Sequence, residues 1–67
     1  MKLTPVESSA IAEIGYDNGT LIIRFHSRRK PYLYPNVPEE LFREFLCAPS
    51  QGKFFHEKIK DKFQPIA

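Results

Sequence analysis

The residues that form disulfides, bind metals or act as nucleophiles are scarce in this chain. Its 67 residues include one cysteine, Cys47, two histidines, His26 and His56, and no tryptophan. A single cysteine excludes an internal disulfide, whereas small domains of oxidising compartments usually contain several. We therefore expect a reduced protein with a cytoplasmic location.

The few candidate catalytic and metal-binding side chains are also poorly spaced for chemistry. The cysteine and the two histidines lack C-x-x-C or H-x-x-x-H spacing and fall in different predicted elements. Glu39 and Glu40 would point about 100° apart on a helix, where they suit its positive end better than acid–base chemistry. The three glycines are dispersed, so no glycine-rich loop is available to bind a phosphate. We expect no catalytic residue, no metal ion and no cofactor, and predict that the chain is not an enzyme.

Long apolar segments are missing too. No stretch approaches the roughly 20 apolar residues that cross a bilayer, and Met1–Glu7 contains no apolar run of signal-peptide length. We expect neither membrane insertion nor secretion, and both Met1–Glu7 and Gln64–Ala67 should fray. The net charge of +2, from ten Lys and Arg against eight Asp and Glu, permits an anionic partner without requiring one.

The chain does contain enough apolar residues for one folded domain. Hydrophobic residues make up 42% of the sequence and aromatic residues 13%, well above the level at which chains stay disordered. A domain of this length buries only about 60% of the surface that its unfolded chain exposes. Nearly every large apolar residue is therefore needed for the core, and residues 1–67 should form a single domain.

Three strands are predicted in the first half of the chain. Ala10–Tyr16 and Leu21–His26 flank the sequence Asp17-Asn18-Gly19-Thr20, which is typical of a β-hairpin turn. Pro31–Tyr34 would form a short third strand, with its proline at the first position or at an edge. The isoleucines of the first strand, Ile11 and Ile14, lie three residues apart and cannot share a face of a regular strand, so we expect either a bulge or a later start of the strand.

Two helices are predicted in the second half, over Pro38–Cys47 and Gln51–Lys62. The first begins with a proline and two glutamates, Pro49 ends it, and Ser50 is a candidate N-cap for the second. Apolar residues at helical spacing give each helix one buried stripe, which leaves Phe54 outside the stripe of the second. The predicted fold class is α+β, a three-stranded antiparallel meander followed by two helices packed on one face.

The predicted core combines alternate strand residues with the apolar stripes of both helices. It comprises Leu21, Ile23, Phe25, Tyr32, Tyr34, Leu41, Phe42, Phe45, Phe55 and Ile59. Two aromatic rings on one strand face could instead stack bases, so Tyr32 and Tyr34 have two interpretations. Burial beneath the helices is the favoured one.

An ordered series of short motifs resembles the KTSC domain, a module named after the C-terminal extension of some lysyl-tRNA synthetases and also found as a free-standing bacterial or phage protein. The motifs are Ser8-Ser9, Ile14-Gly15-Tyr16-Asp17, Leu21-x-Ile23-x-Phe25, Tyr32-x-Tyr34, Val37-Pro38 and Ala48-x-Ser50-x-Gly52-x-Phe54-Phe55. The loop Ser27–Pro31 departs from the family, in which this hairpin is shorter and contains glycine. By analogy with its attachment to a synthetase, the resemblance implies RNA binding.

Basic and apolar residues of the uncovered sheet face form the candidate binding surface. They are Arg24, Arg28, Arg29, Lys30, Ile22 and Leu33. The cations would contact phosphates, and the two apolar residues would line the same surface. The run of three cations at the loop tip can equally be a solvated loop without a partner.

Two functions of different classes remain open for this surface. The first is a small non-catalytic accessory module that binds RNA or another nucleic acid. The second is a protein-docking surface, either for a homodimer or for a larger partner. Binding that weakens steeply with salt would favour phosphate contacts.

Overall fold

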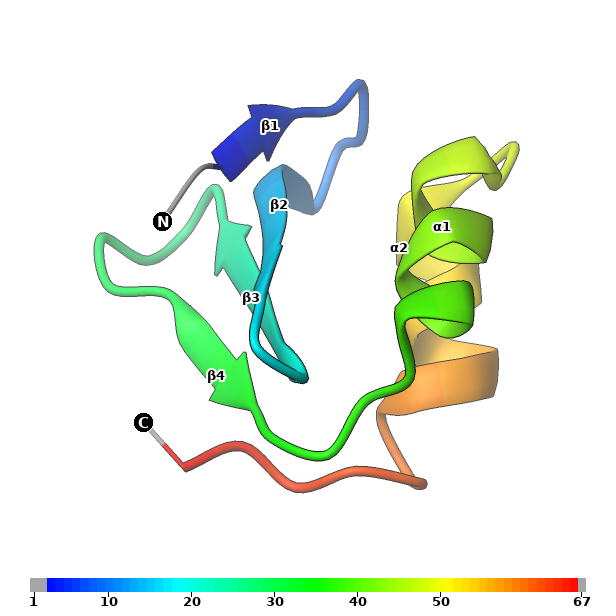
Figure 1. Cartoon of the computed structure of the whole chain (residues 1–67). Helices are drawn as coiled ribbons and strands as arrows, with labels where there is room; N and C mark the ends of the chain where they lie inside the picture. The colour runs from blue at the N-terminus through cyan, green and yellow to red at the C-terminus, as the bar shows by residue number, and fades with distance from the viewer. Residues whose placement is uncertain (1–2, 67) are drawn as a thin grey trace.

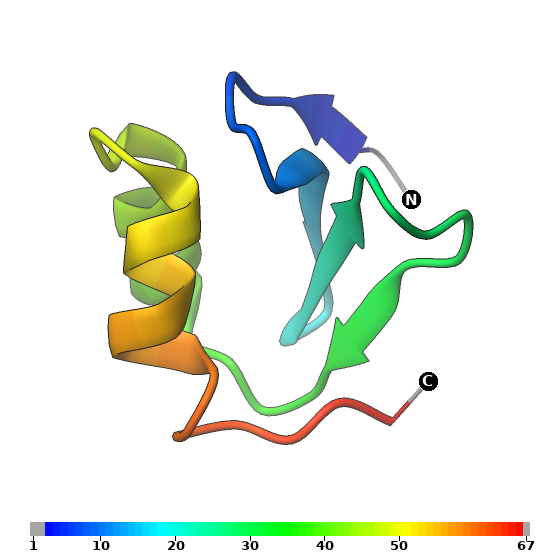
Figure 2. The same cartoon turned by 180° about the vertical axis from the view of Figure 1, so that it is seen from behind.

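Four antiparallel strands form one sheet, and helices lie against one face of it in the computed structural model, which describes residues 3–66 (Figure 1). Each strand pairs with the next: β1 (Leu3–Pro5), β2 (Ile11–Asp17), β3 (Thr20–Phe25) and β4 (Tyr32–Tyr34). The helical elements that follow are α1 (Glu39–Cys47), α2 (Gln51–Phe54) and the π-helix η1 (Phe55–Ile59). The view from behind shows the same two layers (Figure 2). The predicted α+β class, with strands preceding helices, is confirmed.

The predicted number of three strands was wrong, because part of the segment expected to fray forms a fourth. β1 pairs with Glu13–Gly15 of β2. A strand of three residues is too short to show alternation of apolar and polar side chains. Pro5 fits there because β1 is an edge strand, where a missing N–H group breaks no ladder. Since Leu3 lies opposite Gly15, this strand adds an apolar side chain to the outer face of the sheet.

The expected bulge lies in β2. Its pairing register with β3 shifts between Ile11 and Glu13, so Ala12 is the extra residue. The shift lets Ile11 and Ile14 point to the same face, and neither side chain has any exposed surface. The prediction drawn from their spacing is confirmed.

A tight turn and two hydrogen bonds connect the sheet to the helices. Asn18 and Gly19 both have positive φ, 48° and 82°, as a type I′ hairpin turn requires. The Val37 amide donates to the Gly19 carbonyl at 2.9 Å. The Tyr16 hydroxyl donates to the Val37 carbonyl at 2.5 Å. The backbone amide and carbonyl of the buried residue Val37 therefore hold the segment before α1 against the β2–β3 hairpin.

The core lies between the helices and the sheet face that they cover. Its buried residues are Ile11, Ile14, Leu21, Ile23, Tyr34, Val37, Phe45, Phe55 and Ile59. Every residue of the predicted core belongs to this cluster or packs against it. Tyr32 and Tyr34 thus lie on the helix-facing side of the sheet, where Tyr34 is buried as the favoured interpretation predicted and Tyr32 is only partly buried.

The second helix was predicted as one regular helix over Gln51–Lys62, and its second half differs. α2 continues directly into η1, where the Lys60 amide donates to the Phe55 carbonyl, five residues back, at 2.8 Å. Phe54, which lies outside the apolar stripe, stacks on Phe45 of α1 with ring centroids 5.3 Å apart. Phe55 points to the sheet instead. The two adjacent phenylalanines therefore pack against different elements.

The junction between α1 and α2 depends on two side chains. The Ser50 hydroxyl accepts from the Lys53 amide at 3.3 Å, which confirms the predicted N-cap. The buried Gln51 amide group donates to carbonyls at the C-terminal end of α1, at 3.1 Å from Ala48 and 3.4 Å from both Phe45 and Leu46. Helix C-termini leave several carbonyls without an intrahelical partner. Gln51 supplies the missing donor, a role that the sequence did not predict.

Gln51→Glu should therefore destabilise the domain by about 1–3 kcal/mol, because a carboxylate cannot donate to carbonyls and would be buried among them. The free energy of unfolding from urea titration at neutral pH measures this effect. Gln64→Glu makes the same chemical change at an exposed position and should leave stability nearly unchanged. Equal stability of the two variants would mean that Gln51 does not cap α1.

Candidate functional site

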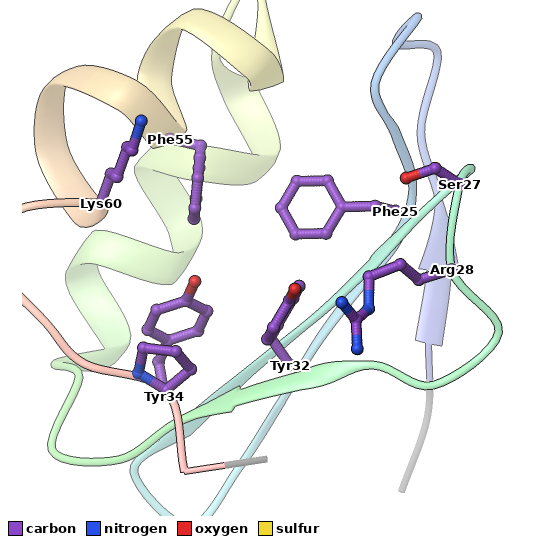
Figure 3. A pocket seen from close by; sticks show the side chains of 8 residues that line it. Phe25, Ser27, Arg28, Tyr32, Tyr34, Phe55 and Lys60 are labelled. Atoms are coloured by element: carbon purple, nitrogen blue, oxygen red, sulfur yellow. The ribbon is translucent and has the colours of Figure 1, made fainter.

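A cavity of about 440 Å³ opens between η1 and the end of the sheet formed by β3 and β4 (Figure 3). Aromatic rings form most of its walls, and cations lie at its margin. It is lined by Phe25, Ser27, Arg28, Tyr32, Tyr34, Phe55, Lys60 and Pro65. We call this cavity the aromatic cleft.

Strand pairing and edge contacts hold the rings of the aromatic cleft in place. The register of β4 sets Tyr32 and Tyr34 opposite buried residues of β3, on the helix-facing side. The Phe25 ring lies 5.5 Å from Tyr32 and 5.4 Å from Phe55, with interplanar angles of 75° and 76°. Edge-to-face packing of this kind is the favoured geometry for aromatic pairs. The walls of the cleft are therefore formed before any ligand binds.

The electrostatic character of the aromatic cleft is positive. The Arg28 guanidinium carbon lies 4.8 Å from the centroid of the Tyr32 ring, within the range of a cation–π contact. Lys60 extends from the helical side (Figure 3). Among the described residues that line the cleft, none is acidic. This arrangement favours a ligand that combines negative charge with a planar or apolar part.

Tyr34 adds a neutral hydroxyl group to the cleft lining. Its side chain is 4% exposed. Burial, and to a lesser extent the neighbouring Tyr32, raises the pKa of the Tyr34 phenol above its ordinary value. The cause is that a buried phenolate loses its hydration. Tyr34 therefore remains a hydrogen-bond donor throughout the neutral range.

This raised pKa predicts a specific loss of stability in alkali. A group whose pKa is higher in the folded state contributes stability that is present below its unfolded pKa and is lost as pH rises through the folded pKa. Above about pH 10, the wild-type chain should therefore lose stability faster than Tyr34→Phe. Urea titrations from neutral to alkaline pH measure the difference, and phenolate absorbance follows the ionisation. Parallel stability curves for the two proteins would contradict the assignment.

One of the three loop cations of the predicted binding surface, Arg28, lines the aromatic cleft. Arg28 was predicted to accompany the outer face of the sheet, but its guanidinium lies over Tyr32 on the helix-facing side. Arg29 and Lys30 follow in the same exposed loop. The attraction of the aromatic ring for a guanidinium explains the direction of Arg28.

The outer sheet face is not assembled as the sequence suggested. Ile22 was predicted to line the binding surface, and this was wrong because its side chain has no exposed area. The strand register places Leu3, Ile22 and Leu33 in one row across the sheet. The fourth member of that row, Gly15, has no side chain, so apolar neighbours flank Ile22 on both sides. Side chains of β4 and of the unpredicted strand β1 therefore flank Ile22 on the outer face.

Two further predicted residues of that face have partners within the chain. Arg24 forms an ion pair with Glu13 at 2.6 Å, and both side chains are partly buried. Leu33 is partly buried, and its carbonyl accepts a hydrogen bond from the Ile66 amide at 2.8 Å. A role of Arg24 or Leu33 in nucleic-acid binding stays a prediction.

Sequence reasoning missed the contribution of the helical side to the site. Phe55 was assigned to the core and Lys60 to the solvent-facing side of its helix, yet both line the aromatic cleft. Alternation correctly predicted which face Phe25 occupies, but it carries no information about how far the helices extend over that face. An excess of aromatic residues at one end of the predicted sheet was the available signal.

The other features that the sequence analysis considered are a metal site, the single cysteine and a membrane-spanning segment. Within residues 3–66, no three His, Cys, Asp or Glu side chains gather to hold a metal ion. Cys47 is exposed with a free thiol. None of the helices in that range has the length and apolar character needed to cross a membrane.

Comparison with known proteins identifies relatives of the same size. A family model described as KTSC domain matches residues 7–63. A protein of Tsukamurella paurometabola is 42% identical over 67 residues, which cover 97% of this chain and 98% of the relative. The crystal structure of a KTSC domain protein from Yersinia pestis has a TM-score of 0.88 and 42% sequence identity, covering 96% of this chain and 92% of that one. The names of these two relatives state no activity.

Proposed function

This chain belongs to the KTSC domain family, and we propose that it is a non-catalytic module that binds single-stranded nucleic acid in the aromatic cleft. One observation carries the proposal: aromatic rings and cations line the cleft, without an acidic side chain among the described residues. Proteins bind single strands with this combination, because bases stack on aromatic rings while cations neutralise phosphates.

Tyr32 is the ring best placed to stack a base. The guanidinium above it, at 4.8 Å, is itself a planar group resting on one face of the ring. A base would take the place of the guanidinium, and Arg28 would pair with the adjoining phosphate. The cavity of about 440 Å³ lies within the range of about 300–1,000 Å³ that is usual for ligand sites. A cavity of this volume can take up one nucleotide of a single strand.

The remaining cations continue the path for the phosphate backbone. Arg29 and Lys30 follow Arg28 along the exposed loop, and Lys60 lies on the opposite wall of the cleft. The protonated Tyr34 hydroxyl supplies a donor for a base edge or sugar oxygen. The alternative hypothesis of protein docking on the outer sheet face has less support, because Ile22 is buried and Arg24 is paired.

Changing Arg28, Arg29 and Lys30 together to serine should weaken binding to every single-stranded oligonucleotide. The slope of log affinity against log salt should shrink by up to about three, one for each phosphate contact removed. Stability should change by no more than about 1 kcal/mol, because the three residues are exposed and only Arg28 loses a contact, with the Tyr32 ring. Fluorescence anisotropy with labelled RNA and DNA strands at several salt concentrations measures both quantities. Affinity and slope that equal those of the wild type would remove the loop from the site.

A pair of matched double variants distinguishes binding in the aromatic cleft from nonspecific attraction between the protein's cations and phosphates. Arg28→Ser with Lys60→Ser removes two cations from the aromatic cleft, whereas Arg43→Ser with Lys53→Ser removes two from exposed helical positions. The first pair should lose affinity far more than the second. Tyr32→Ala should add a loss of about 1–3 kcal/mol, the usual value of one stacked base. If the wild-type chain binds no single strand at low salt, the proposed function is wrong.

A further inference from the structure

A second cavity, of about 250 Å³, lies between α1 and the end of the helical layer around η1. In Figures 1 and 2 the helices lie together on one side of the molecule, opposite the sheet. The cavity is lined chiefly by Glu40, Leu41, Glu44, Lys58, Lys62 and Phe63. We call it the helical groove. It shares no lining residue with the aromatic cleft.

The two walls of the helical groove carry opposite charges. Glu40 and Glu44 come from α1, four residues apart, and Lys58 and Lys62 come from the other wall with the same spacing. All four side chains are exposed. The ion pairs found within residues 3–66 are Arg24 with Glu13 and Arg43 with Glu39, so none of the four groove charges lies within ion-pair distance of the opposite wall. Like charges one helical turn apart repel, and opposite charges on a partner would relieve this repulsion.

The floor of the groove is apolar. Leu41 and Phe63 are partly buried and pack against the core cluster, leaving part of each ring or side chain accessible. An apolar centre within a charged rim is the usual composition of a protein interface. The groove therefore has both elements of a docking site: a contact area that gains from burial and a rim that fixes orientation.

We propose that the partner seated in this groove is a second copy of the same chain. A two-fold symmetric contact places one surface patch against itself, so the patch must be complementary to itself. The helical groove meets that condition, because a two-fold axis through its floor sets the acidic wall of one copy against the basic wall of the other. Leu41 and Phe63 of both copies then meet at the axis.

The surface area that so small a chain can bury limits the affinity of this dimer. Stable interfaces remove about 800 Å² from each partner, about a sixth of the 4697 Å² that this chain exposes. Interfaces of that size use about 20–30 residues on each side, far more than the residues that line the helical groove, so this contact is smaller. The dimer is therefore weak, forms at high protein concentration, and dissociates as salt screens the four charge pairs.

Charge reversal on each wall gives a direct test by sedimentation velocity at high protein concentration and low salt. The wild type should dimerise. Glu40→Lys with Glu44→Lys should be monomeric, and so should Lys58→Glu with Lys62→Glu, because each makes both walls alike. An equimolar mixture of the two variants should recover the dimer, since every contact is again between opposite charges. Circular dichroism shows that each variant is folded.

A third variant controls for attraction between proteins of opposite net charge. Arg29→Glu with Lys53→Glu has the same net charge as the variant with an acidic groove, but its changes lie outside the helical groove. It should dimerise like the wild type and should not pair with the Glu40→Lys, Glu44→Lys variant. A monomeric wild type, or a mixture of the two groove variants that stays monomeric, would overturn the proposal. Neither result bears on nucleic-acid binding, because the two sites share no residue.

Discussion

The two hydrogen bonds of Val37 determine where the helices lie over the sheet. Apolar packing is non-directional, so it can hold two layers together without fixing their relative position. Here the Gly19 carbonyl and the Tyr16 hydroxyl bind the amide and the carbonyl of one residue, immediately before α1 begins. Tyr16 also stacks on Phe42 of α1, with ring centroids 5.2 Å apart. α1 is thereby fixed beside the β2–β3 hairpin, and β4 is left at the margin of the covered area.

Local chemistry made much of this fold predictable, and tertiary contacts decided the rest. The positive φ angles of Asn18 and Gly19 and the Ser50 cap follow from the residues themselves, and the bulge follows from the spacing of two isoleucines. β1 could not be predicted because three residues carry no period. The bonds of Gln51 reach carbonyls three to six residues back, and a π-helix follows α2, but neither feature has a signature in the apolar spacing of the sequence.

The candidate site also combines features that the sequence predicted with features that only tertiary contacts determine. The cationic loop was found from its composition, but the direction of Arg28 is set by the Tyr32 ring, which becomes a neighbour only in the folded chain. Alternation placed Ile22 on the outer face correctly and still gave the wrong exposure, because burial there depends on side chains from β1 and β4. Period-2 reasoning assigns a face, whereas function depends on what covers that face.

The incomplete cover over the aromatic cleft is the strongest physical reason to regard it as a binding site. A domain this small must bury nearly every large apolar residue, yet Phe25 and Tyr32 are among those that remain partly buried, and they lie together in the aromatic cleft. Covering them would gain about 25 cal/mol for each Å² of apolar surface removed from water. The chain after η1 does not do so: it passes along β4, where the Ile66 amide bonds to the Leu33 carbonyl, and contributes only Lys60 and Pro65 to the cleft. A planar ligand stacked on these rings would remove from water the apolar surface that the chain itself leaves exposed.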